Sequence, residues 1–198
     1  GNDFSSATRN EERAERKAED GNPLYAAAVK LFGTKTPVVG AIQGAAVGGG
    51  FGLAVMPDFR VVCPEARFTA NFVKLGFHPG FGLTHTLPRL IGQQKASMLF
   101  LTGRRISGQE AFDIGLADII TDKENLRAEA IKLAAEIAEN APLAVVSVRA
   151  TMREGIQEAV KNQTDHEGRE QHRLQQTADH REGVKAVGER RPGNFIGA

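Results

Sequence analysis

The residues best suited to chemistry are glycines, Gly44 and Gly48–Gly50, which follow a short apolar stretch at Val38–Ile42. Glycine has no Cβ atom, so its backbone can approach a ligand closely, and N–H groups at a helix start can donate hydrogen bonds to an anion. The apolar stretch is typical of a buried strand, and Phe51–Met56 is typical of a helix. The segment predicts a strand, a turn over Gly44–Gly50 and a helix, with a candidate anion or oxyanion site at the turn.

The turn has two other interpretations, a structural connection and a nucleotide site. Glycine turns before helices are often plain tight connections, and this structural interpretation stays open on the segment alone. A nucleotide site is the second alternative, but no Lys-Ser or Lys-Thr pair follows Gly50, and the glycine spacing differs from the dinucleotide-binding pattern. The segment therefore fits neither nucleotide motif.

Two histidines lie in the next informative segment, Asn71–Gly92. Its glycines and prolines predict a short helix, a rigid loop and a new helix from Leu83, and loops of this kind shape pockets. Imidazole titrates near neutral pH, so His78 in the loop is a candidate general base, with a solvent-facing or capping role as the alternative. His85 is expected to pack along the helix rather than to take part in chemistry.

The composition limits the classes of protein to consider. The 198 residues include 25 Lys and Arg against 24 Asp and Glu, a balance that gives no field for nucleic-acid or membrane binding. Cys63 is the single cysteine, which fits a reducing compartment, and no apolar run is long enough to span a membrane. We expect a soluble cytoplasmic protein without a metal site, because the histidines and Cys63 lack metal-ligand spacing.

Other short patterns predict the elements around the glycine turn. They include a helix, two further strands whose strand-helix-strand order with Val38–Ile42 predicts a parallel sheet, and a carboxyl-terminal series dominated by helices. In chain order these are a helix at Leu24–Phe32, strands at Phe59–Cys63 and Ala66–Ala70, helices at Lys95–Leu101 and Ser107–Gly115 with Ser107 as N-cap, a strand at Ala117–Thr121, and helices at Leu126–Ala138 and Leu143–Val160. In a parallel α/β layer ligands lie at the carboxyl ends of the strands, where the glycine turn falls.

The last segment, Gln163–Gly188, is highly polar and has few apolar anchors. We expect it to fold against its neighbours or against another subunit. The domain boundaries predicted are an α/β core over residues 1–140 and a helical region over residues 141–198.

An ordered set of motifs resembles the enoyl-CoA hydratase/isomerase, or crotonase, superfamily over essentially the whole chain. Each motif is weak alone, and the order makes the set specific. The motifs are Gly1-Asn2-Asp3-Phe4, Pro37–Gly44, Gly48–Gly50, Asp58, Phe68, Leu75-Gly76, Pro79-Gly80, Leu87–Gly92, Leu101–Arg104, Ala111–Asp118 and Glu182–Phe195.

The resemblance implies a fold and a reaction. The fold is an α/β spiral of β-β-α units with a carboxyl-terminal helical trimerisation region, and the abrupt opening at Gly1 suggests that an amino-terminal part is missing. The substrate would be an acyl-CoA whose thioester carbonyl accepts hydrogen bonds from the N–H groups of Asn2 and Gly49, so that an enolate is stabilised. Coenzyme A would enter as part of the substrate, with no separate cofactor, and the protein would be a homotrimer or hexamer.

The same resemblance assigns the acid and base residues, and here the sequence departs from the family. Hydratases of the family carry glutamates at the positions of Gly52 and Phe72, and isomerases often carry aspartate at that of Gly80. None of these three residues can transfer a proton, so both usual catalytic glutamates are lacking. The predicted catalytic residues are Asn2, Gly49 and His78, and the predicted substrate-binding residues are Asp3, Phe4, Gly48, Gly52, Phe72, Phe77 and Gly80.

Two classes of function follow from this departure. The first is an acyl-CoA enzyme of the hydratase/isomerase type that uses the oxyanion site. The second is an altered or noncatalytic homologue that binds acyl-CoA without turnover. A hydrolase that cleaves a C–C bond of a diketone is a narrower enzymatic alternative.

Overall fold

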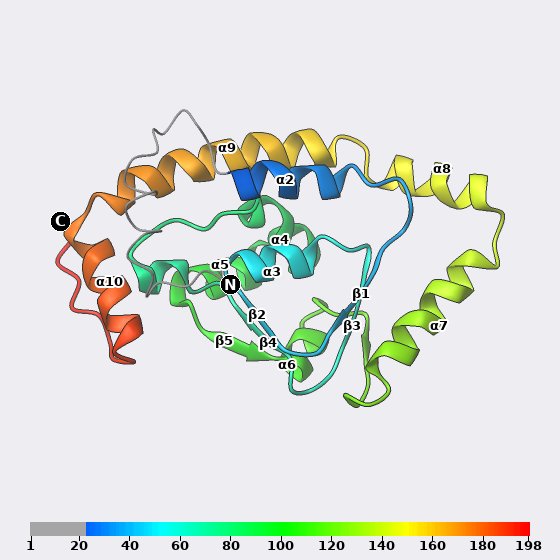
Figure 1. Ribbon diagram of the computed structural model, residues 1–198, viewed down its shortest axis with the longest axis horizontal. Coiled ribbons are helices and arrows are strands. Elements are labelled where there is room, and N and C mark those ends of the chain that lie inside the picture. Colours follow the sequence, from blue (N-terminus) through cyan, green and yellow to red (C-terminus); the bar gives the residue numbers. More distant parts are fainter. Residues whose placement is uncertain (1–22) are drawn as a thin grey trace.

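The computed structural model describes residues 23–198, and the predicted site residues Asn2, Asp3 and Phe4 lie outside this range. Two small sheets are surrounded by helices (Figure 1). The elements are α2 (Pro23–Phe32), β1 (Val39–Ile42), β2 (Ala45–Val47), α3 (Gly49–Val55), β3 (Phe59–Val62), β4 (Arg67–Thr69), the 3-10 helix η2 (Asn71–Leu75), α4 (Leu83–Ile91), α5 (Gln93–Thr102), β5 (Arg105–Ser107), α6 (Gly108–Asp113), β6 (Ile119–Ile120), α7 (Leu126–Ala138), α8 (Pro142–Met152), α9 (Ile156–Gln175) and α10 (Ala178–Gly188). The mixed α/β class is as predicted.

The strand pairings position the glycine turn. One sheet has the order β1-β3-β6 with parallel neighbours, and the other has the order β2-β4-β5, in which β5 runs antiparallel to β4. Val47 pairs with Thr69 at the carboxyl ends of β2 and β4. The N–H of Gly48 then donates to the carbonyl of Thr69 at 3.0 Å. The turn therefore lies at the carboxyl ends of two parallel strands, as predicted.

Two predictions of local structure were wrong. Ala45–Val47 forms strand β2 instead of part of the turn, because pairing with β4 outweighs the weak strand preference of alanine. The predicted helix Leu143–Val160 is two helices, α8 and α9, separated where Gly155 adopts φ 71°. A left-handed glycine ends a helix, and Gly155 was a usable signal for this break.

The predicted cap at Ser107 is confirmed. Its side chain accepts a hydrogen bond from the N–H of Glu110 at 3.2 Å, and the Glu110 carboxylate accepts one from the N–H of Ser107 at 2.8 Å. This reciprocal pair satisfies two donors at the start of α6.

A main core, a smaller one and a third, formed by Val61, Leu126 and Ala130 between β3 and α7, hold these elements. The main core is a set of apolar side chains with almost no exposed surface, whose largest members are Phe51, Phe68, Leu83, Leu87, Leu99, Ile106 and Leu116. The smaller one joins α2 and α9 to the segment between η2 and α4, and it consists of Tyr25, Ala28, Phe32, Met56, Phe81 and Val160. The second core brings α9 next to Phe81.

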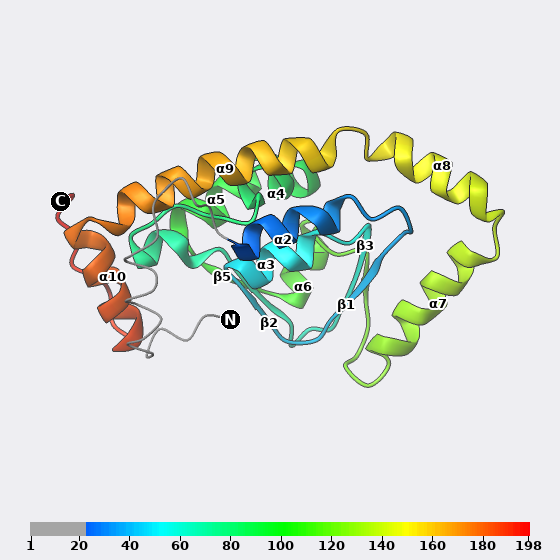
Figure 2. The same cartoon turned by 45° about the horizontal axis from the view of Figure 1, so that its top comes forward.

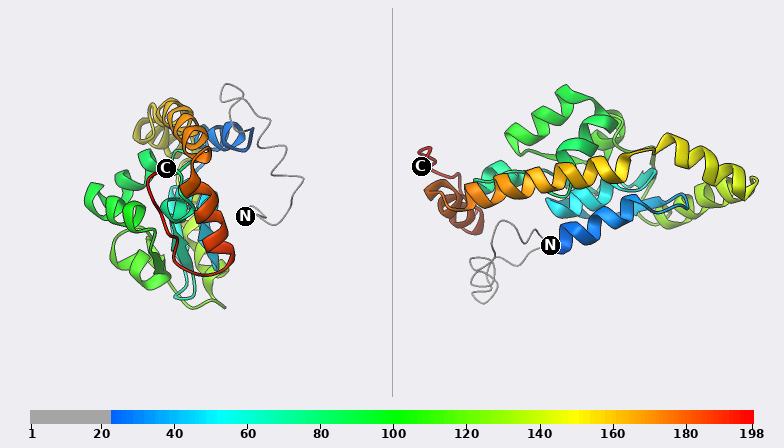
Figure 3. Two further views of the ribbon diagram at one scale, coloured as in Figure 1. Left: turned by 90° about the vertical axis from the view of Figure 1, so that its left-hand side faces the viewer. Right: turned by 90° about the horizontal axis from the view of Figure 1, so that it is seen from above.

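The helices extend the molecule along one axis. Figures 2 and 3 show α7 and α8 at one end, α10 at the other, and α9 running between them beside α2. The contacts of α9 with α2 and α4 agree with these views. None of the helices between residues 23 and 198 has both the length and the apolar character that crossing a lipid bilayer requires.

Candidate functional site

The glycine turn presents an unpaired backbone donor. Gly48 has φ 55° and ψ −119°, a conformation that favours glycine, and it precedes the first residue of α3. Within residues 23–198, the N–H of Gly49 has no hydrogen-bond acceptor, as expected for the first position of a helix. Gly49 is partly exposed, and the helix makes no use of its N–H.

The ring of Phe81 lies against this turn. A Cβ atom added at Gly49 would be 3.8 Å from Phe81 Cδ2, and one added at Gly52 would be only 2.5 Å from Phe81 Cγ. Phe81 is 5% exposed and meets Tyr25 edge to face, with ring centroids 6.0 Å apart. Its φ of 68° is unusual for a bulky residue. Sequence reasoning missed Phe81, because no residue pattern forecasts a left-handed phenylalanine.

Phe72 lies next to the turn at Gly48. A Cβ added at Gly48 would lie 3.6 Å from Phe72 Cζ, and Phe72 is 3% exposed. Phe77 packs edge to face on Phe72, with ring centroids 5.6 Å apart. The structure therefore brings Gly48, Phe72 and Phe77 together, and it places the position assigned to the second glutamate in an apolar wall.

His78 and Gly80 face the carboxyl-terminal helices. His78 Nδ1 lies 2.9 Å from the carbonyl of Pro79, and its ring meets that of His166 on α9 with centroids 5.8 Å apart. The His78 carbonyl accepts a hydrogen bond from Gln171 Nε2 at 2.9 Å. A Cβ at Gly80 would lie 2.5 Å from the same Gln171 nitrogen. Gly80 thus allows α9 to pack closely on this loop.

Glu167 on α9 fixes the loop that carries Phe81, and no sequence pattern pointed to this residue. Its carboxylate is fully buried and accepts hydrogen bonds from the N–H of Gly82 at 2.6 Å and the N–H of Thr84 at 3.0 Å, as well as from the Thr84 hydroxyl at 2.5 Å. Burial raises the pKa of Glu167, although these three bonds act in the opposite direction. Glu167 therefore caps α4 and positions Phe81 from one residue away.

His85, on the next helix, differs from His78 in its surroundings. Burial and the charge of Arg89 lower the pKa of the His85 imidazole.

No metal site is found in the described part of the chain. No cluster of three or more His, Cys, Asp or Glu side chains there is arranged to hold an ion.

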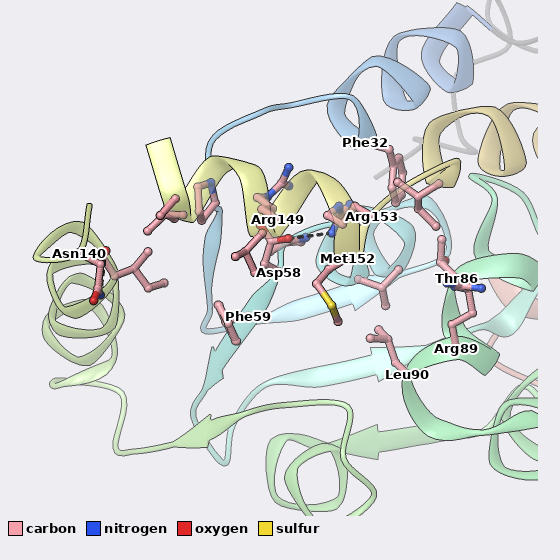
Figure 4. Close-up of a pocket in the computed structure, with 18 residues that line it drawn as sticks. Phe32, Asp58, Phe59, Thr86, Arg89, Leu90, Asn140, Arg149, Met152 and Arg153 are labelled. Atoms are coloured by element: carbon pink, nitrogen blue, oxygen red, sulfur yellow. Dashed lines mark hydrogen bonds and ion pairs between the residues drawn. The ribbon is translucent and has the colours of Figure 1, made fainter. Parts of the chain in front are cut away.

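A cavity of about 750 Å³ lies at the other end of α3, between α4, α7 and α8 (Figure 4). Its walls are mostly apolar and include Phe59, Leu90 and Met152. Asp58 borders it and binds two guanidinium groups, Arg149 Nε at 2.8 Å and Arg153 Nη1 at 3.0 Å. The cavity contains none of the glycine-turn residues, so we treat it as separate from the candidate site.

A backbone donor at the carboxyl ends of parallel strands, between aromatic walls, defines an α/β protein with a potential oxyanion-binding turn. The family model described as enoyl-CoA hydratase/isomerase matches residues 1–198. The chain belongs to this family, and its crotonase-like fold is as predicted.

Individual relatives agree with the family assignment. The chain is 39% identical over 160 residues to the crotonyl-CoA hydratase of Syntrophomonas wolfei, a match that covers 81% of this chain and 62% of the relative. It is 38% identical over 121 residues to the short-chain-enoyl-CoA hydratase of Clostridium acetobutylicum, covering 61% and 46%. The crystal structure of an enoyl-CoA hydratase/isomerase from Pseudoalteromonas atlantica aligns with TM-score 0.77 and 30% identity, over 85% of this chain and 68% of that one. The chain thus spans less than two thirds of these two curated relatives.

Proposed function

We propose that this chain forms part of an acyl-CoA enzyme of the enoyl-CoA hydratase/isomerase type, which stabilises an enolate through backbone N–H groups. The observation that carries the proposal is the N–H of Gly49, unpaired within residues 23–198 and accessible at a glycine turn. A donor held in place before the reaction stabilises the negative charge that develops on a thioester oxygen. The N–H of Asn2 is the proposed second donor.

The role of the Gly49 N–H can be tested with a variant that lacks this donor and keeps the turn. Proline is tolerated at the first position of a helix, so Gly49→Pro deletes the donor where the helix does not use it. Gly49→Ala is the matched control, because it keeps the N–H and its Cβ would be 3.8 Å from Phe81, an ordinary contact.

The assay is exchange of the acyl-CoA α-proton with deuterated water, followed by mass spectrometry. Loss of one oxyanion donor costs about 10²- to 10³-fold in rate. We expect Gly49→Pro to lose exchange by this factor while Gly49→Ala stays within a few-fold of the wild type. Equal rates for the wild type and Gly49→Pro, both folded by circular dichroism, would refute the role of this N–H.

We further propose His78 as the general base. The Pro79 carbonyl can only accept a hydrogen bond, so His78 Nδ1 carries the proton and Nε2 is left as the basic atom of the neutral ring. His78→Ala should reduce α-proton exchange by about 10²- to 10⁴-fold, the usual contribution of a general base. His166→Ala, which removes the neighbouring ring on α9, is the control and should exchange at nearly the wild-type rate.

The proposed assembly is a homotrimer or hexamer in the cytoplasm. Support comes from the family and from large apolar side chains exposed at one end of the molecule, including Leu143, 86% exposed, and Met152, 77% exposed. Sedimentation velocity on the purified protein should give a trimer or hexamer, and a monomer at micromolar concentration would refute the assembly.

A further inference from the structure

The side chain of Phe81 fills the space that a side chain at position 52 would need. A Cβ at position 52 would lie 2.5–2.6 Å from Phe81 Cβ, Cγ and Cδ1. These atoms form the root of the side chain, which cannot swing away as the end of a flexible chain would. The ring is also held by Tyr25 and by the cluster that includes Val160. Glycine is therefore the residue that position 52 accommodates while Phe81 is in place.

The loop holds Phe81 in this position from both sides. Its backbone has φ 68°, which bulky residues adopt rarely and which persists where the surroundings fix it. On its carboxyl-terminal side, the N–H of Gly82 is bound by the buried Glu167. On its amino-terminal side, Gly80 packs against Tyr25 and Gln171. The ring is thus a fixed wall of the glycine turn.

This wall stands next to the proposed oxyanion donor. The same ring that fills the space beside Gly52 comes within 3.8 Å of a Cβ at Gly49, and Phe72 lines the turn at Gly48. Both positions to which the family resemblance assigns glutamates are therefore associated with aromatic rings. The polar atom nearest to a Cβ at Gly48 is the amide oxygen of Asn71, at 3.9 Å, which cannot act as a base. Aromatic rings hold no water by hydrogen bonds and move no protons, whereas adding water to a double bond requires a group that activates the water.

We propose that Phe81 is a specificity-determining residue that keeps water from the substrate carbons beside the thioester. The site is thereby restricted to enolate reactions in which a proton moves along the acyl chain and no water molecule is added. This inference rests on the proposed function, since it takes the Gly49 N–H as the thioester site. It deepens that function by naming the class of reaction.

The first experiment tests the shared volume by thermal unfolding. Gly52→Ala should lower the melting temperature clearly in the wild type and much less in a Phe81→Ala background, where room has been made. Gly50→Ala is the matched control in the same turn, because nothing lies within 4 Å of a Cβ there, and it should leave the melting temperature nearly unchanged. A Gly52→Ala effect of equal size in both backgrounds would overturn the coupling.

The second experiment tests the chemistry with enoyl-CoA in ¹⁸O-labelled water. We expect only background ¹⁸O incorporation by the wild type and at least a tenfold gain for the double variant Gly52→Glu/Phe81→Ala, which restores room and a carboxylate. Gly52→Gln/Phe81→Ala has the same shape without the charge and should show no gain. Hydration by the wild type at the rate of the double variant, or no gain in a folded double variant that binds acyl-CoA, would overturn the role of Phe81.

Calorimetric titration of the wild type with a saturated acyl-CoA, read together with the ¹⁸O assay on enoyl-CoA, separates this inference from the proposed function. Binding together with rapid hydration would refute the role of Phe81 and leave the acyl-CoA site intact. Absence of binding would refute the acyl-CoA site itself, and with it the reaction class inferred here.

Discussion

Helices α8 and α9 follow one another in the chain, and each packs on the protein in a way that its composition does not predict. α8 is rich in apolar residues, yet Leu143, Val148 and Met152 are exposed and its buried residue is Arg149. α9 is polar, yet it buries Glu167 and other polar side chains against the loop that carries Phe81. Each helix is anchored by a charged group with specific partners.

The difference assigns separate roles to the two anchors. The Arg149 anchor joins α8 to Asp58, beyond the carboxyl end of α3. The Glu167 anchor joins α9 to the start of α4, next to Phe81. Loss of the first should therefore disturb the arm formed by α7 and α8, and loss of the second should disturb the candidate site. Three of the following predictions test this contrast, and one, at Glu182, tests a charged anchor on α10. They run from the largest expected effect to the smallest.

Asp58→Ala should have the largest effect on stability. It leaves Arg149, whose side chain is 8% exposed, without its carboxylate partner, and breaking a buried ion pair in this way costs about 3–5 kcal/mol. Urea unfolding measures the loss, and hydrogen exchange should rise first in α8. Asp165→Ala, which breaks the exposed pair with Lys161, is the control and should cost about 0.3–0.5 kcal/mol. Equal losses in the two variants would contradict the anchoring of α8.

Glu167→Gln should cost about 1–3 kcal/mol, because the amide cannot accept all the hydrogen bonds from Gly82 and Thr84. Burial raises the pKa of Glu167 in the folded protein above its value in the unfolded chain. The stabilisation that Glu167 provides is therefore complete at a pH below the pKa of the unfolded chain, and it falls as the pH rises through the pKa of the folded protein. The stability deficit of the variant should therefore grow as the pH falls toward 4.5. Urea unfolding across this pH range measures the deficit, and a Glu167→Gln variant with normal stability and normal hydrogen exchange at residues 81–84 would show that α9 is anchored elsewhere.

Glu182→Gln should have a smaller effect that depends on pH. Arg191 and the N–H of Asn194 hold the pKa of Glu182 at about 2. The stability gained by the carboxylate is therefore present above pH 4.5 and is lost as the pH falls toward 2. Melting temperatures of the wild type and the variant should differ at pH 6 and converge near pH 2. A gap that does not change with pH would mean that the pairing with Arg191 is not its cause.

Met152→Ser should have the smallest effect on the stability of the monomeric fold. The side chain is 77% exposed on α8, and surface substitutions of this kind change stability by less than about 0.5 kcal/mol. Urea unfolding at low protein concentration measures this value. A loss of several kcal/mol would show that α8 is held by apolar packing and would break the contrast with α9.

Much of the fold was accessible from sequence because it depends on local signals. The strand at Val39–Ile42, the glycine turn and the Ser107 cap follow from short-range patterns. The break at Gly155 was missed because the apolar pattern runs on across it, although the glycine itself marks a helix end.

The walls of the candidate site were not accessible in the same way. Phe81 depends on a left-handed backbone, and Glu167 on contacts with residues more than 80 positions away. No local pattern contains this information, because tertiary packing determines both. Gly49 could be proposed from the sequence because the role proposed for it needs only a backbone N–H at a glycine turn, whereas the surroundings of that N–H depend on the folded chain.

The most direct test of the central claim is the infrared stretching frequency of an acyl-CoA ¹³C-labelled at the thioester carbonyl, compared between free and bound states. If the Gly49 N–H polarises this carbonyl, the band should move to lower frequency on binding to the wild type and to Gly49→Ala, and the move should be much smaller with Gly49→Pro. An unchanged frequency in the bound wild type, or the same shift in all three proteins, would contradict the account.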